Sequence, residues 1–211
     1  METISAWHDA TLGQRAVKAL EKNKFAAAYF PDAESAVSHI LGLVPEGVSV
    51  GVGGSMTIQA LGLTGKLPGR TILDHNVPGL PKDEVREIRY KQLASDVFLT
   101  GTNAVTLKGE LVNVDGTGNR VAAMFFGPKK IIVIAGANKI VRNLDEAQAR
   151  IRMIAAPLNN KRLNLPNPCV QTGECMDCNN ATRICNVTTI ISRCPSLSEI
   201  HVILIGGQYG Y

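Results

Sequence analysis

The sequence predicts an α/β protein with a mostly parallel central sheet flanked by helices. Short β-branched segments alternate along the chain with longer segments of helical periodicity, which is typical of this class. The segment Lys130–Ala135 is apolar after its first residue without interruption, as expected of a parallel strand that helices cover on both faces. We place this strand at the centre of the sheet.

The chain begins with two expected helices. Thr11–Tyr29 is rich in Ala and Lys and contains no Pro, and Asp32–Leu43 has acidic residues near its beginning and apolar residues at helical spacing. The short β-branched segment Val48–Val52 predicts a strand. A glycine turn follows it, and Met56–Leu61 predicts a short helix, so this part reads as a strand, a turn and a helix.

The middle of the chain continues the alternation and adds a hairpin. Lys108-Gly109 lies between two apolar-rich segments, Ala104–Leu107 and Glu110–Asn113, and a permissive residue at this position favours an antiparallel turn. The other elements expected here are a strand over Arg70–Asp74, a charged helix over Lys82–Ala94, a strand over Asp96–Thr100 and a helix over Asn119–Phe126.

A last helix and strand complete the sheet. Asn143 is followed three residues later by Glu146, which is the form of a helix N-cap, and we expect this helix to end at Pro157. His201–Ile205 predicts the final strand. All elements belong to one expected domain over residues 1–211, with a cysteine-rich segment (169–194) before the last strand.

Composition narrows the classes of partner. A net charge of +4 is modest, and the basic residues are scattered without interleaved aromatic side chains, so nucleic acid is not an expected partner. No apolar run approaches the ~20 residues of a membrane-spanning helix. The first residues lack the basic and apolar regions of a secretion signal. We therefore expect a cytoplasmic protein that does not associate with membranes.

The cysteines are the strongest chemical signal. All five lie between Cys169 and Cys194, and the first four have the spacing C-x5-C-x2-C-x6-C. In a reducing cytosol such clustered thiols favour a metal or redox centre over structural disulfides. The expected metal ligands are Cys169, Cys175, Cys178 and Cys185.

An iron–sulfur cluster of the 4Fe-4S type is the favoured cofactor. Zinc is the alternative, but only Cys175 and Cys178 have its C-x2-C spacing and no His lies nearby. Reduced thiols that pack or react remain a third alternative. Cys194 is followed by Pro195, and we expect it to be a buried small hydrophobic residue.

The glycine turn is a candidate ligand site. Glycines after a strand allow close approach of a ligand, and a following helix offers free N–H groups to an anion, which makes Gly53, Gly54, Ser55 and Thr57 candidates for binding. The segment lacks the Gly-Lys-Ser/Thr ending of a phosphate-binding loop and the G-x-S-x-G pattern of a nucleophilic serine. A tight turn without a ligand is an equal alternative.

Four more candidates are expected near the same edge of the sheet. Asn103 lies beside the hairpin, Asn119 and Arg120 begin a helix, and Lys139 follows the central strand. Open α/β sheets bind ligands where their strands end. Taken alone, Lys139 is no more than a surface lysine, and Asp115-Gly116 reads as a turn.

These motifs together resemble the lactate-utilisation (LUD) domain family over most of the chain. The resemblance rests on their order and spacing as well as on the run Cys169–Cys185; the other segments that carry it are Gly53–Thr57, Gly101–Thr106, Gly118–Ala122, Phe126–Pro128 and Ala135–Val141. The family is similar in architecture to glucosamine-phosphate isomerases, ribose-phosphate isomerases and CoA transferases. That likeness implies a central sheet flanked by helices, with a ligand crevice beside the glycine turn.

Two functions are expected from the resemblance and the motifs. The first is an iron–sulfur protein in the utilisation of lactate-type organic acids and in electron transfer. It would bind a small organic acid or another anionic metabolite and work with further iron–sulfur or redox subunits. The second is a sugar-phosphate isomerase or acyl/CoA-transfer enzyme with structural zinc. Larger relatives carry a C-x2-C-x2-C-x3-C-P run that this chain lacks, so the lactate role is an inference from relatives. Homo-oligomerisation is left open.

Overall fold

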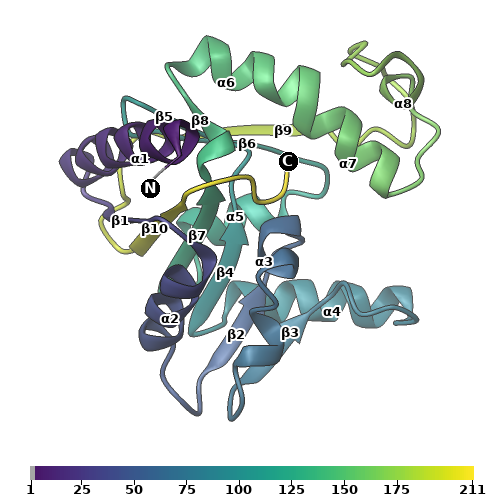
Figure 1. Ribbon diagram of the computed structural model, residues 1–211. Coiled ribbons are helices and arrows are strands. Elements are labelled where there is room, and N and C mark those ends of the chain that lie inside the picture. The colour runs from purple at the N-terminus through teal and green to yellow at the C-terminus, as the bar shows by residue number, and fades with distance from the viewer. Residues whose placement is uncertain (1–2) are drawn as a thin grey trace.

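The central sheet of the computed structural model, which describes residues 3–211, has six strands that are all parallel (Figure 1). Their order is β1-β10-β7-β4-β2-β3. The bounds are β1 Ala26–Phe30, β2 Ser49–Val52, β3 Thr71–Asp74, β4 Val97–Gly101, β7 Lys130–Gly136 and β10 Glu199–Ile205. The expected position of the Lys130–Ala135 strand inside the sheet is confirmed, since β7 pairs with both β10 and β4.

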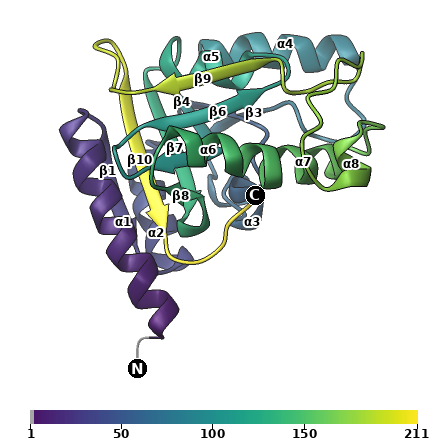
Figure 2. The same cartoon turned by 90° about the horizontal axis from the view of Figure 1, so that it is seen from above.

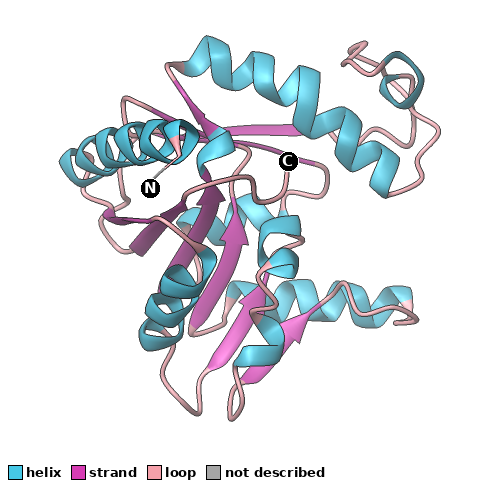
Figure 3. Ribbon diagram, in the orientation of Figure 1, coloured by secondary structure: helices cyan, strands magenta, loops and turns pink. Residues whose placement is uncertain are grey.

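Helices cover both faces of this sheet (Figure 3). The helices are α1 Ile4–Lys22, α2 Ala33–Leu43, α3 Met56–Ala60, α4 Lys82–Leu93 and α5 Asn119–Phe125, with a short 3-10 turn over Thr64–Lys66. Alternate residues of β7 face opposite cores. Ile132 and Ile134 pack with residues of α2 and α3, whereas Ile131 and Val133 pack with residues of α1 and α5. This two-sided burial explains why the strand is apolar throughout.

The expected hairpin belongs to a second, smaller sheet of order β8-β5-β6-β9. Its strands are β5 Ala104–Thr106, β6 Leu111–Asp115, β8 Ile140–Val141 and β9 Val187–Ile191. β5 and β6 pair antiparallel, and Gly109 takes the positive φ of 80° that the turn requires. A 3-10 turn, Ala137–Lys139, leads from β7 into β8. Strand β9, which pairs with β6, is absent from the expectations.

A long helical segment crosses the small sheet and leads to the cysteines (Figures 1 and 2). It consists of α6 Leu144–Arg150, a π-helical turn Ile151–Ala155 and α7 Ala156–Arg162, followed by α8 Cys169–Thr172. The expected N-cap is confirmed, because the Asn143 side chain accepts a hydrogen bond from the Glu146 amide. Ala147 and Ile151 pack against Ala104 and Val112 of the hairpin.

Two expectations about secondary structure are wrong. The first helix ends at Lys22, Lys24 adopts a φ of 68°, and Ala26–Phe30 forms β1 because it pairs with β10 in register. An edge of the sheet thus overrides the helical propensity of an Ala-rich segment. Pro157 does not end its helix, since the π-helical turn before it changes the bonding pattern and the helix continues to Arg162.

The topology reverses at β2 and β4. From β2 the chain first adds β3 on one side, then returns through β4 to β7 and β10 on the other side. Ligands of open parallel sheets bind at such a reversal, beyond the carboxyl ends of the strands. None of the helices within residues 3–211 combines the length and apolarity needed to cross a bilayer.

Candidate functional site

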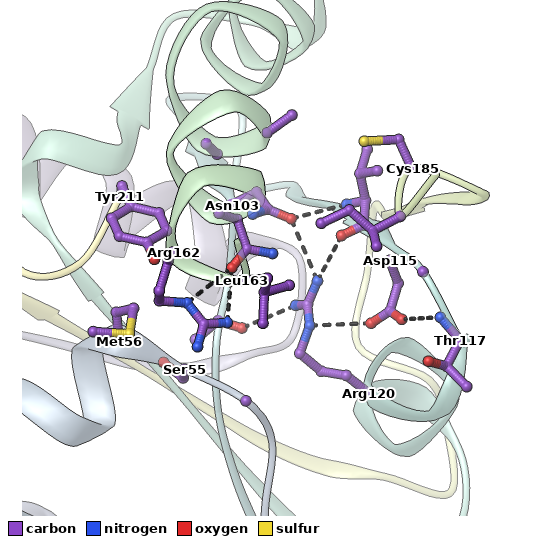
Figure 4. A pocket seen from close by; sticks show the side chains of 18 of the residues that line it. Ser55, Met56, Asn103, Asp115, Thr117, Arg120, Arg162, Leu163, Cys185 and Tyr211 are labelled. Carbon is purple, nitrogen blue, oxygen red and sulfur yellow. Dashed lines mark hydrogen bonds and ion pairs between the residues drawn. The ribbon is translucent and has the colours of Figure 1, made fainter. Parts of the chain in front are cut away.

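A cavity of about 230 Å³ lies at the carboxyl edge of the central sheet. Residues that follow five strands reach it: Ser55 after β2, His75 after β3, Asn103 after β4, Lys139 after β7 and Tyr211 after β10. The end of α7 contributes Arg162, and the cysteine segment contributes Cys185. Figure 4 shows Ser55, Met56, Asn103, Arg120, Arg162, Cys185 and Tyr211 around this space. The topological reversal therefore coincides with a real cavity.

Six of the eight candidate binding residues line the cavity, namely Gly54, Ser55, Asn103, Asn119, Arg120 and Lys139. The other two candidates, Gly53 and Thr57, do not line the cavity. A Cβ on Gly53 would come within 3.1 Å of Thr100 Oγ1 and 3.3 Å of Arg120 Cγ, so this glycine serves packing. Thr57 is fully buried.

Ser55 has a local structural role. Its hydroxyl caps α3 by accepting from the amide of Ile58. A Cβ on Gly101 would lie only 2.7 Å from the Ser55 hydroxyl oxygen, so the ends of β2 and β4 are in close contact here. Gly53 and Gly101 thus allow the ends of β2 and β4 to pack closely beside the cavity.

Arg120 links helix α5 to the hairpin. Its Nε forms an ion pair with Oδ2 of Asp115 at 3.2 Å, and its Nη1 donates to Asn113 Oδ1 at 2.6 Å. Nη2 donates to the Val114 carbonyl at 2.9 Å. Burial lowers the pKa of Arg120, and the Asp115 carboxylate offsets part of this effect. With its donors engaged and its charge paired, Arg120 holds the hairpin to α5.

Asn103 also fixes the hairpin. Its side-chain oxygen accepts from the Val114 amide at 2.9 Å, and its carbonyl accepts from Arg150 Nη1 at 2.7 Å. Asn103 thus joins β6 to the long helical segment. Asn119 lines the cavity from the first turn of α5, which has no side-chain cap.

Lys139 is the most unusual charged residue of the cavity. It is 4% exposed, and its Nζ donates to Thr57 Oγ1 at 3.1 Å, with no carboxylate paired to it among the described residues. Burial lowers the pKa of Lys139 to about 7, and the nearby charges of Arg150 and Arg120 lower it in the same direction. The amine therefore exchanges its proton near neutral pH. The sequence predicted Lys139 as a site residue, but it did not predict that its amine would be buried.

Among the cavity residues that the sequence did not predict are His75, Arg89, Arg162 and Tyr211. His75 directly follows β3, so the rule that ligands lie at strand ends gave a signal for it. Arg89 lies among many charged residues of α4 and carries no distinguishing pattern. Tyr211 reaches the cavity because the Asn138 side chain donates to the Gly210 carbonyl and the Tyr209 carbonyl accepts from Thr57. Such long-range contacts leave no local trace in the sequence.

The four expected metal ligands are free thiols that interact electrostatically. Burial raises the pKa of Cys169, and the charges of Cys178 and Cys175 raise it further. Burial likewise raises the pKa of Cys185, followed by the charge of Cys175. Within residues 3–211, however, no three Cys, His, Asp or Glu side chains converge closely enough to hold a metal ion. The four sulfurs are thus neighbours without being assembled into a ligand set.

Arg183 organises the segment that carries these thiols. Its Nη1 donates to the Cys178 carbonyl, its Nε donates to the Cys185 carbonyl at 3.0 Å, and its Nη2 pairs with Asp177 at 3.1 Å. Cys194 lies apart, packed against the core of the central sheet, with its sulfur 3.3 Å from the Ser198 carbonyl oxygen. Cys194 is thus half-buried rather than fully buried as expected, and the role of the other four cysteines as metal ligands stays a prediction.

A protein of known structure has a similar fold. The chain is similar to a DUF162 family protein of known structure from Deinococcus radiodurans, with a TM-score of 0.55 and 16% sequence identity over 94% of this chain and 98% of the other. This likeness concerns the fold alone. The expected similarity to sugar-phosphate isomerases and CoA transferases stays a prediction.

No curated protein matches the sequence. The LUD domain family, in contrast, matches residues 13–205, which include both sheets, the cavity-lining residues other than Tyr211 and all five cysteines. The chain belongs to the LUD domain family.

Proposed function

We propose that this protein binds a small organic acid in the cavity and an iron–sulfur cluster at Cys169, Cys175, Cys178 and Cys185. It would act in organic-acid utilisation of the lactate type and in electron transfer. Membership of the LUD domain family supports a role related to lactate utilisation. The iron–sulfur cluster and the binding of a small organic acid are the parts of this proposal that go beyond membership of the family.

The observation that carries the proposal is the position of Cys185. This residue belongs to the group of four interacting thiols and also lines the cavity. A redox centre held there would adjoin a bound acid, and short separation favours electron transfer between them. No other cysteine of the described chain lines this cavity.

The chemistry of the donor set fits a cluster. Thiolates are the ligands that iron–sulfur clusters use, and a cluster supplies one-electron transfer when it is bound. After burial, the negative charges of the neighbouring thiols raise the pKa of Cys169 and of Cys185 further. A cationic centre removes this repulsion. Three of the four cysteines lie in an irregular segment without regular secondary structure, which can draw the sulfurs together on binding.

The charge of the cavity fits an organic anion. Among the described residues of the lining, Asp115 is the one acidic residue, and it is paired with Arg120. Arg89, Arg162 and Lys139 add positive charge without a carboxylate partner among the described residues. A small acid of a few carbon atoms fits a volume of about 230 Å³. The cavity therefore suits a carboxylate better than a neutral ligand.

Anaerobic purification followed by iron, sulfide and zinc analysis tests the cluster. The proposal predicts a brown protein with bound iron and sulfide, whose visible absorbance bleaches on reduction. Cys175→Ser abolishes the iron, whereas Cys194→Ser, which removes a sulfur packed on the core, retains it. A colourless protein with stoichiometric zinc contradicts the cluster and favours a structural metal.

A further inference from the structure

His75 and Arg89 form a second part of the cavity wall. His75 follows β3 at the edge of the central sheet, and Arg89 comes from the third turn of α4. The two side chains are close enough for the charge of Arg89 to lower the pKa of His75.

The contacts of the Gln92 side chain favour one tautomer of His75. The Gln92 side-chain nitrogen lies 2.9 Å from the Val52 carbonyl oxygen, 2.8 Å from the Leu73 carbonyl oxygen and 3.0 Å from His75 Nδ1. Carbonyl oxygens only accept, so the Gln92 amide group directs its N–H bonds into this group of acceptors. An amide nitrogen donates and does not accept, so the contact with Gln92 assigns the role of acceptor to Nδ1 of His75.

A neutral imidazole with an unprotonated Nδ1 carries its hydrogen on Nε2. Burial, and then the charge of Arg89, lower the pKa of His75, which agrees with this neutral form. Nε2 has no partner among the described residues. His75 thus offers the cavity one neutral N–H donor.

Arg89 supplies a charge without a partner. Its Nε is buried and lacks a hydrogen-bond acceptor, and no carboxylate of the described chain forms an ion pair with its guanidinium group. Leaving a buried donor unsatisfied is unfavourable, because the group has lost its contact with water and has gained no acceptor. Arg120, on the same cavity, has all three nitrogens engaged, so the contrast between the two arginines is clear.

We infer that Arg89 and His75 form the subsite that binds the carboxylate group of the ligand. The planar guanidinium group matches a carboxylate with two parallel N–H donors, and the neutral His75 adds one further donor. Because His75 is uncharged, the pair carries a single positive charge, which balances a monoanionic carboxylate better than a phosphate dianion. The inference deepens the proposed function by giving the organic acid its anchoring group.

Calorimetric titration of the full-length protein with L-lactate, pyruvate and inorganic phosphate tests the subsite. The titration is done on metal-free protein and on protein as purified anaerobically. We expect at least one of the two carboxylates to bind, and Arg89→Gln to weaken its binding tenfold or more. Arg89→Lys keeps the charge but loses the forked donors, and we expect an intermediate affinity.

Arg86→Gln is the matched control. Arg86 lies one turn earlier on α4, its side chain is 64% exposed, and its ion pair is with Asp83 on the same helix. Its replacement leaves the affinity unchanged if Arg89 acts through the cavity. Circular dichroism of each variant verifies that α4 is folded.

The outcomes separate the two proposals. Arg89-dependent carboxylate binding, when the anaerobically purified protein contains no iron, supports the subsite and contradicts the cluster. Equal affinity of wild type and Arg89→Gln, absence of carboxylate binding in both preparations, or binding of phosphate alone overturns the subsite, whatever the metal content.

Discussion

The carbonyl oxygen of Arg152 accepts a hydrogen bond from the amide of Cys175 at 2.9 Å, joining the long helix to the cysteine segment. In the π-helical turn the Ala156 amide bonds to the Ile151 carbonyl, so the next amide would bond to Arg152. That next residue is Pro157, which has no N–H. The proline therefore leaves an acceptor free, and the cysteine segment uses it.

Pro157→Ala is expected to loosen the cysteine segment. The new N–H competes with Cys175 for the Arg152 carbonyl, so amide exchange in the segment over 173–186 becomes faster. Hydrogen exchange with mass spectrometry measures this. Leu158→Ala, at a half-exposed neighbour on the same helix, leaves the exchange unchanged. Equal protection in Pro157→Ala and wild type would show that the bond does not anchor the segment.

The buried pair of Arg120 and Asp115 is expected to stabilise the protein only as a pair. Arg120→Met leaves the Asp115 carboxylate uncompensated, and we expect a loss of about 3–5 kcal/mol in the free energy of unfolding. Asp115→Asn retains an acceptor for the Thr117 and Gly118 amides but leaves Arg120 unpaired. The double variant loses less than the sum of the two single variants.

Urea unfolding of the four proteins measures this coupling. Arg142→Met serves as the control, because Arg142 pairs with Glu146 on an exposed surface and such pairs contribute about 0–1 kcal/mol. If the losses of the two single variants simply add up in the double variant, Arg120 and Asp115 do not stabilise the protein through their contact.

Lys139 is expected to make stability depend on pH. Its pKa is about 7 in the folded protein and 10.5 in a free side chain, so between these values the unfolded chain holds a proton that the folded protein lacks. Stability from this group therefore rises with pH from about 7 to 10.5, by up to ~1.4 kcal/mol per pH unit, and the full penalty is present below pH 7.

Lys139→Met removes this dependence. Urea unfolding at pH 7 and pH 9 under reducing, metal-free conditions compares the variant with the wild type, and the other titrating groups cancel in the difference. The wild type gains stability relative to the variant as the pH rises. An identical pH dependence of both proteins would mean that the Lys139 amine keeps an ordinary pKa.

Gly136→Ala is expected to displace the last residues from the cavity. A Cβ there would lie 2.4 Å from Asn138 Oδ1 and 2.6 Å from the Tyr209 amide nitrogen, while φ is an unstrained −71°. The clash is therefore steric, and we expect a loss of about 1–3 kcal/mol and faster amide exchange at Tyr209 and Gly210. Gly42→Ala, which meets nothing within 4 Å in helix α2, is neutral or stabilising. Unchanged exchange in Gly136→Ala would contradict the tight contact.

Hydrophobic periodicity and turn residues determined most of the elements. The uninterrupted Lys130–Ala135 segment is buried on both faces of β7, and the Lys108-Gly109 turn closes the hairpin as its residues predict. The sequence also determined the grouping of four cysteines and six of the residues that line the cavity. These features are local, because each depends on residue types at short spacing.

Tertiary structure decided the rest through contacts between distant segments. Ala26–Phe30 is a strand because β10 pairs with it, and Pro157 stays within a helix because a π-helical turn absorbs its missing donor. Arg120 and Arg89 look alike in the sequence, yet only the first meets a carboxylate after folding. Whether an arginine side chain is paired within the protein or left without a partner depends on the residues that the fold brings next to it. No local sequence pattern predicts this.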